Sequence, residues 1–209
     1  MKKLIFGILG FMTIACQSQT ETKEAKVDVE KSVIEKIMTR RSVRVYENKA
    51  VTRCDIDEVL KCGIHAPSAI NKQPWEIRVV DDVKFISESR DIYLSLDSTR
   101  VKGVSHTFPN APVYLFVARD KEFDWSYTDC GLLCGNICNA AWAKGLGTVI
   151  MGSTANVYKS TPELAEYMTK LGFSENYELL VVIALGYPNE TPQVKPRDMS
   201  KLKYVEPQE

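Results

Sequence analysis

Two apolar segments constrain the fold of this chain more than any other feature of its sequence. Residues Pro112–Ala118 are strongly apolar, and residues Glu178–Leu185 are apolar and rich in β-branched side chains. Short runs of this composition predict strands, and a strand without polar alternation is buried on both faces. The chain is therefore expected to fold around a covered sheet.

The remaining elements follow from apolar spacing along the chain. Helices are predicted over Glu30–Thr39, Asp55–Ala66, Val83–Leu96, Tyr127–Lys144 and Thr161–Leu171, and further strands over Glu76–Val80 and Thr148–Met151. We expect a loop over Ser98–Asn110, and a polar, proline-rich segment over Tyr187–Glu209 that is extended and packed on a surface. Helices and strands mix without a regular βαβ rhythm, which favours an α+β domain over a doubly wound one.

The charge balance excludes one class of partner. The chain has 209 residues, with 27 basic and 27 acidic side chains, so its formal net charge is zero. Nucleic-acid-binding domains normally carry a basic excess, so no nucleic-acid partner is expected.

The N-terminus predicts export. Lys2 and Lys3 precede an apolar run over Leu4–Ala15, which is shorter than the ~20 residues of a membrane-spanning helix. The run ends in Thr13-Ile14-Ala15-Cys16, which resembles a bacterial lipobox, and this resemblance implies cleavage before Cys16 and attachment of a lipid to it. An ordinary signal peptide, or a buried helix that carries a cysteine, is the alternative.

These features divide the chain into three parts. Residues 1–15 are expected to be a lipoprotein signal peptide, residues 16–29 the lipidated cysteine and a flexible polar tether, and residues 30–209 the folded domain. The predicted location is outside the cytoplasm, on a membrane surface that the lipid anchors.

A basic cluster closes the first predicted helix. Residues Arg40–Arg44 read R-R-S-V-R and bring three guanidinium groups and the hydroxyl of Ser42 within five positions. Guanidinium groups bind phosphate in a bidentate manner, and a hydroxyl adds another hydrogen bond. The alternative is a solvated basic helix end that complements the helix dipole.

A second cluster lies in the loop Ala66–Trp75, which reads A-P-S-A-I-N-K-Q-P-W. Its two prolines restrict the backbone, and small Ser68 allows a flat ligand to approach. Asn71 and Gln73 each carry donors and acceptors, which suits a ring edge with carbonyl and imide groups. A structural loop anchored by a buried tryptophan is the alternative.

Two weaker motifs complete the set. Gly145–Thr148 reads G-L-G-T and leads into a strand that runs through Met151 to Gly152, where backbone N–H groups can face a ligand. Lys195-Pro196-Arg197 is a second candidate source of positive charge for a phosphate. A plain turn and a solvated tail are the respective alternatives.

Together, in this order and at these separations, the four motifs resemble the nitroreductase superfamily from about Glu30 to Arg197. The resemblance implies a central mixed or antiparallel sheet flanked by helices, an intertwined homodimer, and FMN bound at the dimer interface. The cofactor-binding residues that follow from the motifs are Arg40, Arg41, Ser42, Arg44, Pro67, Ser68, Asn71, Gln73, Met151, Gly152, Lys195 and Arg197.

The implied activity is the FMN-dependent reduction of a small nitroaromatic, quinone or related acceptor, by ping-pong transfer from NAD(P)H or another donor. The protein then supplies binding, orientation and electrostatics, so no catalytic acid, base or nucleophile is assigned. Alternatives are an exported flavin- or ligand-binding lipoprotein without NAD(P)H-dependent turnover, and another reaction on the same scaffold. Met151 and Ile70 depart from residues often found at these positions, which bears on the substrate more than on the cofactor.

Three cysteines on the longest predicted helix, Cys130, Cys134 and Cys138, recur every four residues and lie along one stripe. Close helix packing explains this spacing better than a metal or redox site, because a free cysteine behaves as a small apolar residue.

Overall fold

The computed structural model describes residues 32–96 and 108–205. The signal peptide, Cys16, the tether and most of the loop predicted over Ser98–Asn110 lie outside the described residues. The chain divides into two compact units, Met1–Thr39 and Arg40–Glu209. Of the helix predicted over Glu30–Thr39, residues 32–39 are described and are helical.

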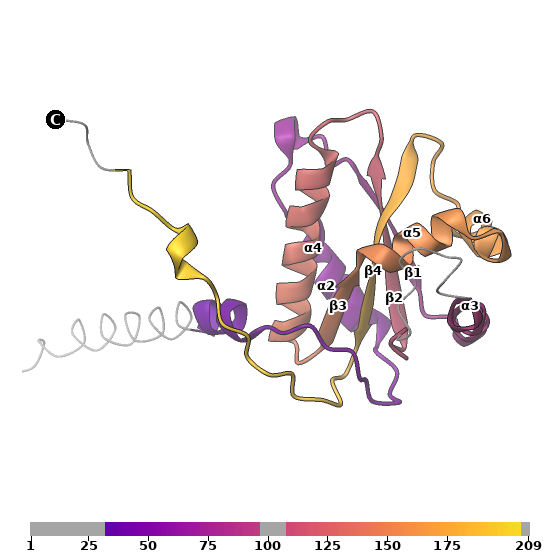
Figure 1. Ribbon diagram of the computed structural model, residues 1–209, viewed down its shortest axis with the longest axis horizontal. Helices are drawn as coiled ribbons and strands as arrows, with labels where there is room; N and C mark the ends of the chain where they lie inside the picture. The colour runs from indigo at the N-terminus through magenta and orange to yellow at the C-terminus, as the bar shows by residue number, and fades with distance from the viewer. Residues whose placement is uncertain (1–31, 97–107, 206–209) are drawn as a thin grey trace, which may run out of the picture. The chain divides into compact units, whose positions relative to one another are not determined.

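The second unit is built on a four-stranded antiparallel sheet in the order β1-β2-β4-β3. Its strands are β1 (Trp75–Val80), β2 (Val113–Asp120), β3 (Gly147–Met151) and β4 (Tyr177–Gly186). The two apolar segments of the sequence are therefore the central strands, as Figure 1 shows. A bulge at Val117/Ala118 shifts the register between them.

Helices cover both faces of this sheet. One layer contains α2 (Arg53–Ile64) and α4 (Ser126–Ala143), and the other contains α3 (Val83–Ser95), α5 (Gly152–Ser160) and α6 (Ala165–Leu171), as seen in Figure 1. Along β2, Leu115 packs in the core beneath α2 and α4, whereas Tyr114 and Phe116 pack in the opposite core. The α+β prediction is confirmed.

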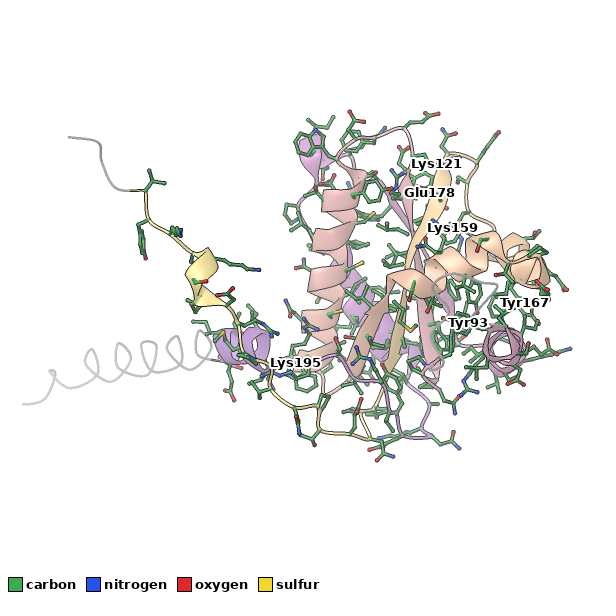
Figure 2. The ribbon with its side chains drawn as sticks, viewed as in Figure 1. Tyr93, Lys121, Lys159, Tyr167, Glu178 and Lys195 are labelled. Carbon is green, nitrogen blue, oxygen red and sulfur yellow. The ribbon has the colours of Figure 1, made fainter. Side chains whose placement is uncertain are left out.

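Most element bounds agree with the sequence to within two residues. There are two exceptions among the helices. The first part of the helix predicted over Thr161–Leu171 is a 3-10 turn over Pro162–Leu164, and α6 begins only at Ala165. Helix α5 was missed, because the sequence analysis ended a strand at Gly152 and assigned no element to the residues that follow. Figure 2 labels Tyr93 of α3 and Tyr167 of α6, which belong to the core that α5 completes. Among the helices in residues 32–96 and 108–205, none combines the length and apolar character needed to cross a membrane.

The prediction for the C-terminal segment was partly wrong. It lacks regular structure apart from a 3-10 turn over Met199–Lys201, as expected. However, residues 193–205 are exposed in the single chain rather than packed on its surface. Apolar side chains there, including Leu202 and Tyr204 with exposed fractions of 69% and 95%, therefore contact solvent.

Candidate functional site

A positively charged pocket joins two motifs that lie about 150 residues apart in the sequence. We call it the basic pocket; it has a volume of about 210 Å³ and is lined by Arg40, Arg41, Ser42, Arg44, Pro192, Gln193, Lys195 and Arg197. None of the described residues that line it is acidic. The six residues predicted from the first and the fourth motif are therefore brought together, whereas Pro192 and Gln193 were not foreseen.

Backbone pairing explains why these two segments meet. The N–H of Glu47 donates to the carbonyl of Tyr187, and the N–H of Asn189 donates to the carbonyl of Val45, both at 2.9 Å. Glu190 extends this pairing, because its carboxylate accepts hydrogen bonds from the N–H groups of Arg44 and Val45. The chain after β4 therefore runs beside the arginine segment and carries Lys195, labelled in Figure 2, to it.

Gly147 lets the arginine segment lie against the sheet. Ser42 forms a parallel bridge with Thr148, and the N–H of Val43 donates to the carbonyl of Thr148 at 2.9 Å. A Cβ atom at Gly147 would lie 2.7 Å from the Cβ of Val43. The first glycine of this strand is thus required by a close backbone approach.

The guanidinium groups of the basic pocket are oriented by neutral partners. Arg41 Nη1 donates to the carbonyl of Arg40 at 2.8 Å, and Arg197 Nη1 donates to the carbonyl of Lys195 at 3.0 Å. Carbonyl oxygens orient a guanidinium without neutralising its charge. The pocket therefore suits a doubly charged phosphate monoester, for which arginine forks are the preferred protein ligands.

The loop Ser68–Gln73 has an unusual backbone. Ile70, Asn71 and Gln73 have φ angles of 51°, 55° and 49°, in the left-handed region that costs a residue with a Cβ atom about 1–2 kcal/mol. The side chain of Ile70 is 89% exposed, so its burial does not offset this cost. The loop holds its shape in part because Ser68 Oγ accepts from the N–H of Gln73 at 3.1 Å.

The polar side chains of this loop face solvent. Gln73 Nε2 lies 3.3 Å from Asn71 Oδ1 and donates to it, and both residues are exposed. Their remaining donors and acceptors are therefore accessible to a ligand.

The third motif ends a strand and begins a helix. Strand β3 ends at Met151, and Gly152 is the first residue of α5 rather than the last of the strand. A Cβ atom at Gly152 would have no neighbour within 4 Å among the described residues, so the space beside this backbone is open. The first N–H groups of a helix have no intrahelical acceptor and carry partial positive charge, so they can donate to a ligand.

The phosphate and ring motifs lie at opposite ends of the sheet within one chain. The basic pocket adjoins Gly147, which pairs with Gly186, whereas Trp75 at the end of the loop pairs with Arg119, which pairs with Glu178. From Glu178 to Gly186, β4 extends about 27 Å at ~3.4 Å per residue. Figure 1 shows the loop beside the start of α4 and the arginine segment below the sheet.

The three cysteines of α4 are buried. Burial raises the pKa of Cys130 and of Cys134 to about 12, and it also raises the pKa of Cys138. Thiols of this kind are protonated at neutral pH, whereas metal binding and thiol exchange both need the thiolate. Their environment therefore favours packing, as the sequence analysis preferred.

Comparison with known proteins agrees with this architecture. The model of the nitroreductase family matches residues 37–187, so the chain belongs to that family. A relative from Archaeoglobus fulgidus, whose name refers to an NADH dehydrogenase/NAD(P)H nitroreductase activity, is 31% identical over 159 residues, which cover 74% of this chain and 84% of the relative.

Solved structures extend the comparison to a bound cofactor. A nitroreductase from Desulfitobacterium hafniense with bound FMN has a TM-score of 0.73 and 27% identity, over 84% of this chain and 98% of its own. A nitroreductase from Bacteroides fragilis with bound FMN has a TM-score of 0.72 and 26% identity, over 83% and 98%.

Proposed function

We propose that this chain is an FMN-dependent oxidoreductase that transfers reducing equivalents from NAD(P)H or another donor to a small nitroaromatic, quinone or related acceptor, by a ping-pong scheme. The basic pocket is the observation that carries this proposal, because its cations match the phosphate monoester of FMN. Membership of the nitroreductase family and two FMN-containing structural neighbours support it.

Different residues are proposed to contact different parts of FMN. In this proposal the first motif (Arg40, Arg41, Ser42 and Arg44) holds the phosphate and the pyrimidine edge of the flavin, and Lys195 and Arg197 complete the phosphate site. Pro67, Ser68, Asn71 and Gln73 line the ring, and the backbone N–H groups near Met151 and Gly152 donate to it. When bound, FMN supplies the hydride- and electron-transfer chemistry, so the chain needs to bind, orient and exclude water rather than provide an acid or base.

A homodimer is part of the proposal, because the two halves of the site are too far apart in one chain for a single mononucleotide. Exposed apolar side chains on α4 and on the C-terminal segment support it. Leu132 is 43% exposed, and Cβ atoms built at Gly131 and Gly135 would meet nothing within 4 Å in the described chain. Small residues on an open helix face allow a second copy to pack closely.

We expect the purified full-length chain to show a flavin absorption band that bleaches when NADH or NADPH is added without oxygen. The basic pocket retains the cofactor, and bleaching reports its reduction. A band that persists would instead support a flavin-binding protein that uses another donor or does not turn over. No band after added FMN would contradict the cofactor assignment.

We also propose that the protein is an exported lipoprotein anchored through Cys16, which rests on the N-terminal sequence alone. Cells grown with labelled palmitate should label the wild-type chain and leave Cys16→Ala unlabelled, because the thiol is the attachment site. Equal labelling of both chains would reject the anchor.

A further inference from the structure

A buried carboxylate outside the four motifs contacts the proposed ring loop. Asp129 lies in the first turn of α4 and is only 3% exposed. Its two carboxylate oxygens accept from the N–H of Ala69, at distances of 3.1 Å and 3.3 Å. Ala69 directly precedes Ile70, the first of the residues with a positive φ angle. The carboxylate therefore contacts the loop where its unusual backbone begins.

The start of α4 is itself held by the sheet. Arg119 of β2 forms an ion pair with Glu178 of β4, and its Nη1 donates to Ser126 Oγ at 3.1 Å. The guanidinium also lies over the ring of Tyr127, 3.8 Å from the ring centroid. These contacts fix the first turn of the helix on a rigid support, so the position of Asp129 is defined independently of the loop.

The first turn of α4 is an electrostatically favourable position for the carboxylate of Asp129. The first turn of a helix stabilises negative charge through the helix dipole, and a hydrogen bond to an ionised acceptor is stronger than one to a neutral acceptor. The other titratable groups nearby are Cys130, whose pKa is raised mainly by burial, and Arg119. The hydrogen bonds from Ala69 to this buried carboxylate restrain the backbone directly before the exposed, left-handed Ile70.

We propose that Asp129 is a positioning residue that holds the Ser68–Gln73 loop in the shape that receives the ring of the ligand. This inference rests on the proposed function of the loop. Without the carboxylate, Ile70 and Asn71 relax toward negative φ angles, and the groups of Ser68 and Asn71 lose their alignment. The basic pocket lies at the other end of the sheet and keeps its structure.

The test compares Asp129→Ala with Asp129→Asn in the full-length chain. Asp129→Ala should weaken the binding of FMN and riboflavin equally, by about tenfold, because both share the ring. It should also change the visible circular dichroism of the flavin at saturation. Asp129→Asn keeps an oxygen acceptor at the same place and should lose less affinity.

A second substitution separates positioning from a general loss of stability. Adding Ile70→Gly to Asp129→Ala should restore much of the affinity and the dichroism, because glycine adopts a positive φ angle without strain. A folded Asp129→Ala chain with wild-type affinity and dichroism would overturn the inference. So would an affinity loss, or a failure to fold, that Ile70→Gly does not reverse at all. If the wild-type chain binds neither flavin, the proposed function itself fails.

Discussion

The double variant Lys195→Ala/Arg197→Ala is expected to bind FMN with about a hundredfold lower affinity and to keep its affinity for riboflavin. Both side chains line the basic pocket, and riboflavin has the same ring but lacks the phosphate. A hydrogen bond from a charged donor contributes about 1.5–3 kcal/mol, and 1.4 kcal/mol corresponds to a tenfold change in affinity. Fluorescence titration with the two flavins measures both values.

The matched control is Lys201→Ala, which removes an exposed lysine of the same C-terminal segment that does not line the basic pocket. It should leave both affinities unchanged. Raising the salt concentration should reduce the preference of the wild-type chain for FMN, because screening weakens exposed charges. An equal loss of FMN and riboflavin in the double variant would show that the pocket does not hold the phosphate.

Two defective variants are expected to restore binding when they are combined in one dimer. The first is Lys195→Ala/Arg197→Ala, and the second is Asn71→Ala/Gln73→Ala in the ring loop. In a two-fold symmetric dimer whose sites each take the basic pocket of one chain and the loop of the other, a mixed dimer has one doubly defective and one intact site. Neither variant alone has an intact site.

Co-expression with two affinity tags isolates the mixed dimer, and its flavin content measures the outcome. We expect about one FMN per mixed dimer, about two per wild-type dimer, and little in either variant alone. A mixed dimer that binds no better than its parents would place the whole site within one chain. Failure to recover any doubly tagged complex would contradict the proposed homodimer.

Local sequence was sufficient to predict most of the secondary structure. Strands β2 and β4 are apolar enough to be recognised as buried, and α4 was predicted within one residue at each end. Helix α5 was missed because it begins Gly-Ser-Thr, residues that disfavour helices, so its amphipathic face was not recognised. Its helical state depends on packing Ala155, Val157 and Tyr158 into the core.

The candidate site also combines features that local sequence predicted with features that depend on the tertiary structure. The residue types of each motif indicated phosphate and ring chemistry, because guanidinium forks and amide groups have defined hydrogen-bonding capacity wherever they lie. The role of Asp129 had no sequence signal, since its contact with Ala69 joins residues 60 positions apart. The exposure of residues 193–205 was also not foreseen, because composition does not report which surface a segment meets.

The sequence by itself determined the periodicities that form the helices and strands, and the chemistry of each motif, because both depend on neighbouring residues. Only the tertiary structure decided which motifs meet. Pairing beside Tyr46 and Pro188 brings the C-terminal cations to the arginine segment, whereas the sheet separates the ring loop from both. The relative positions of the motifs depend on hydrogen bonds between distant parts of the chain and on the close approach of Val43 to Gly147. The spacing of residues along the sequence does not encode these contacts.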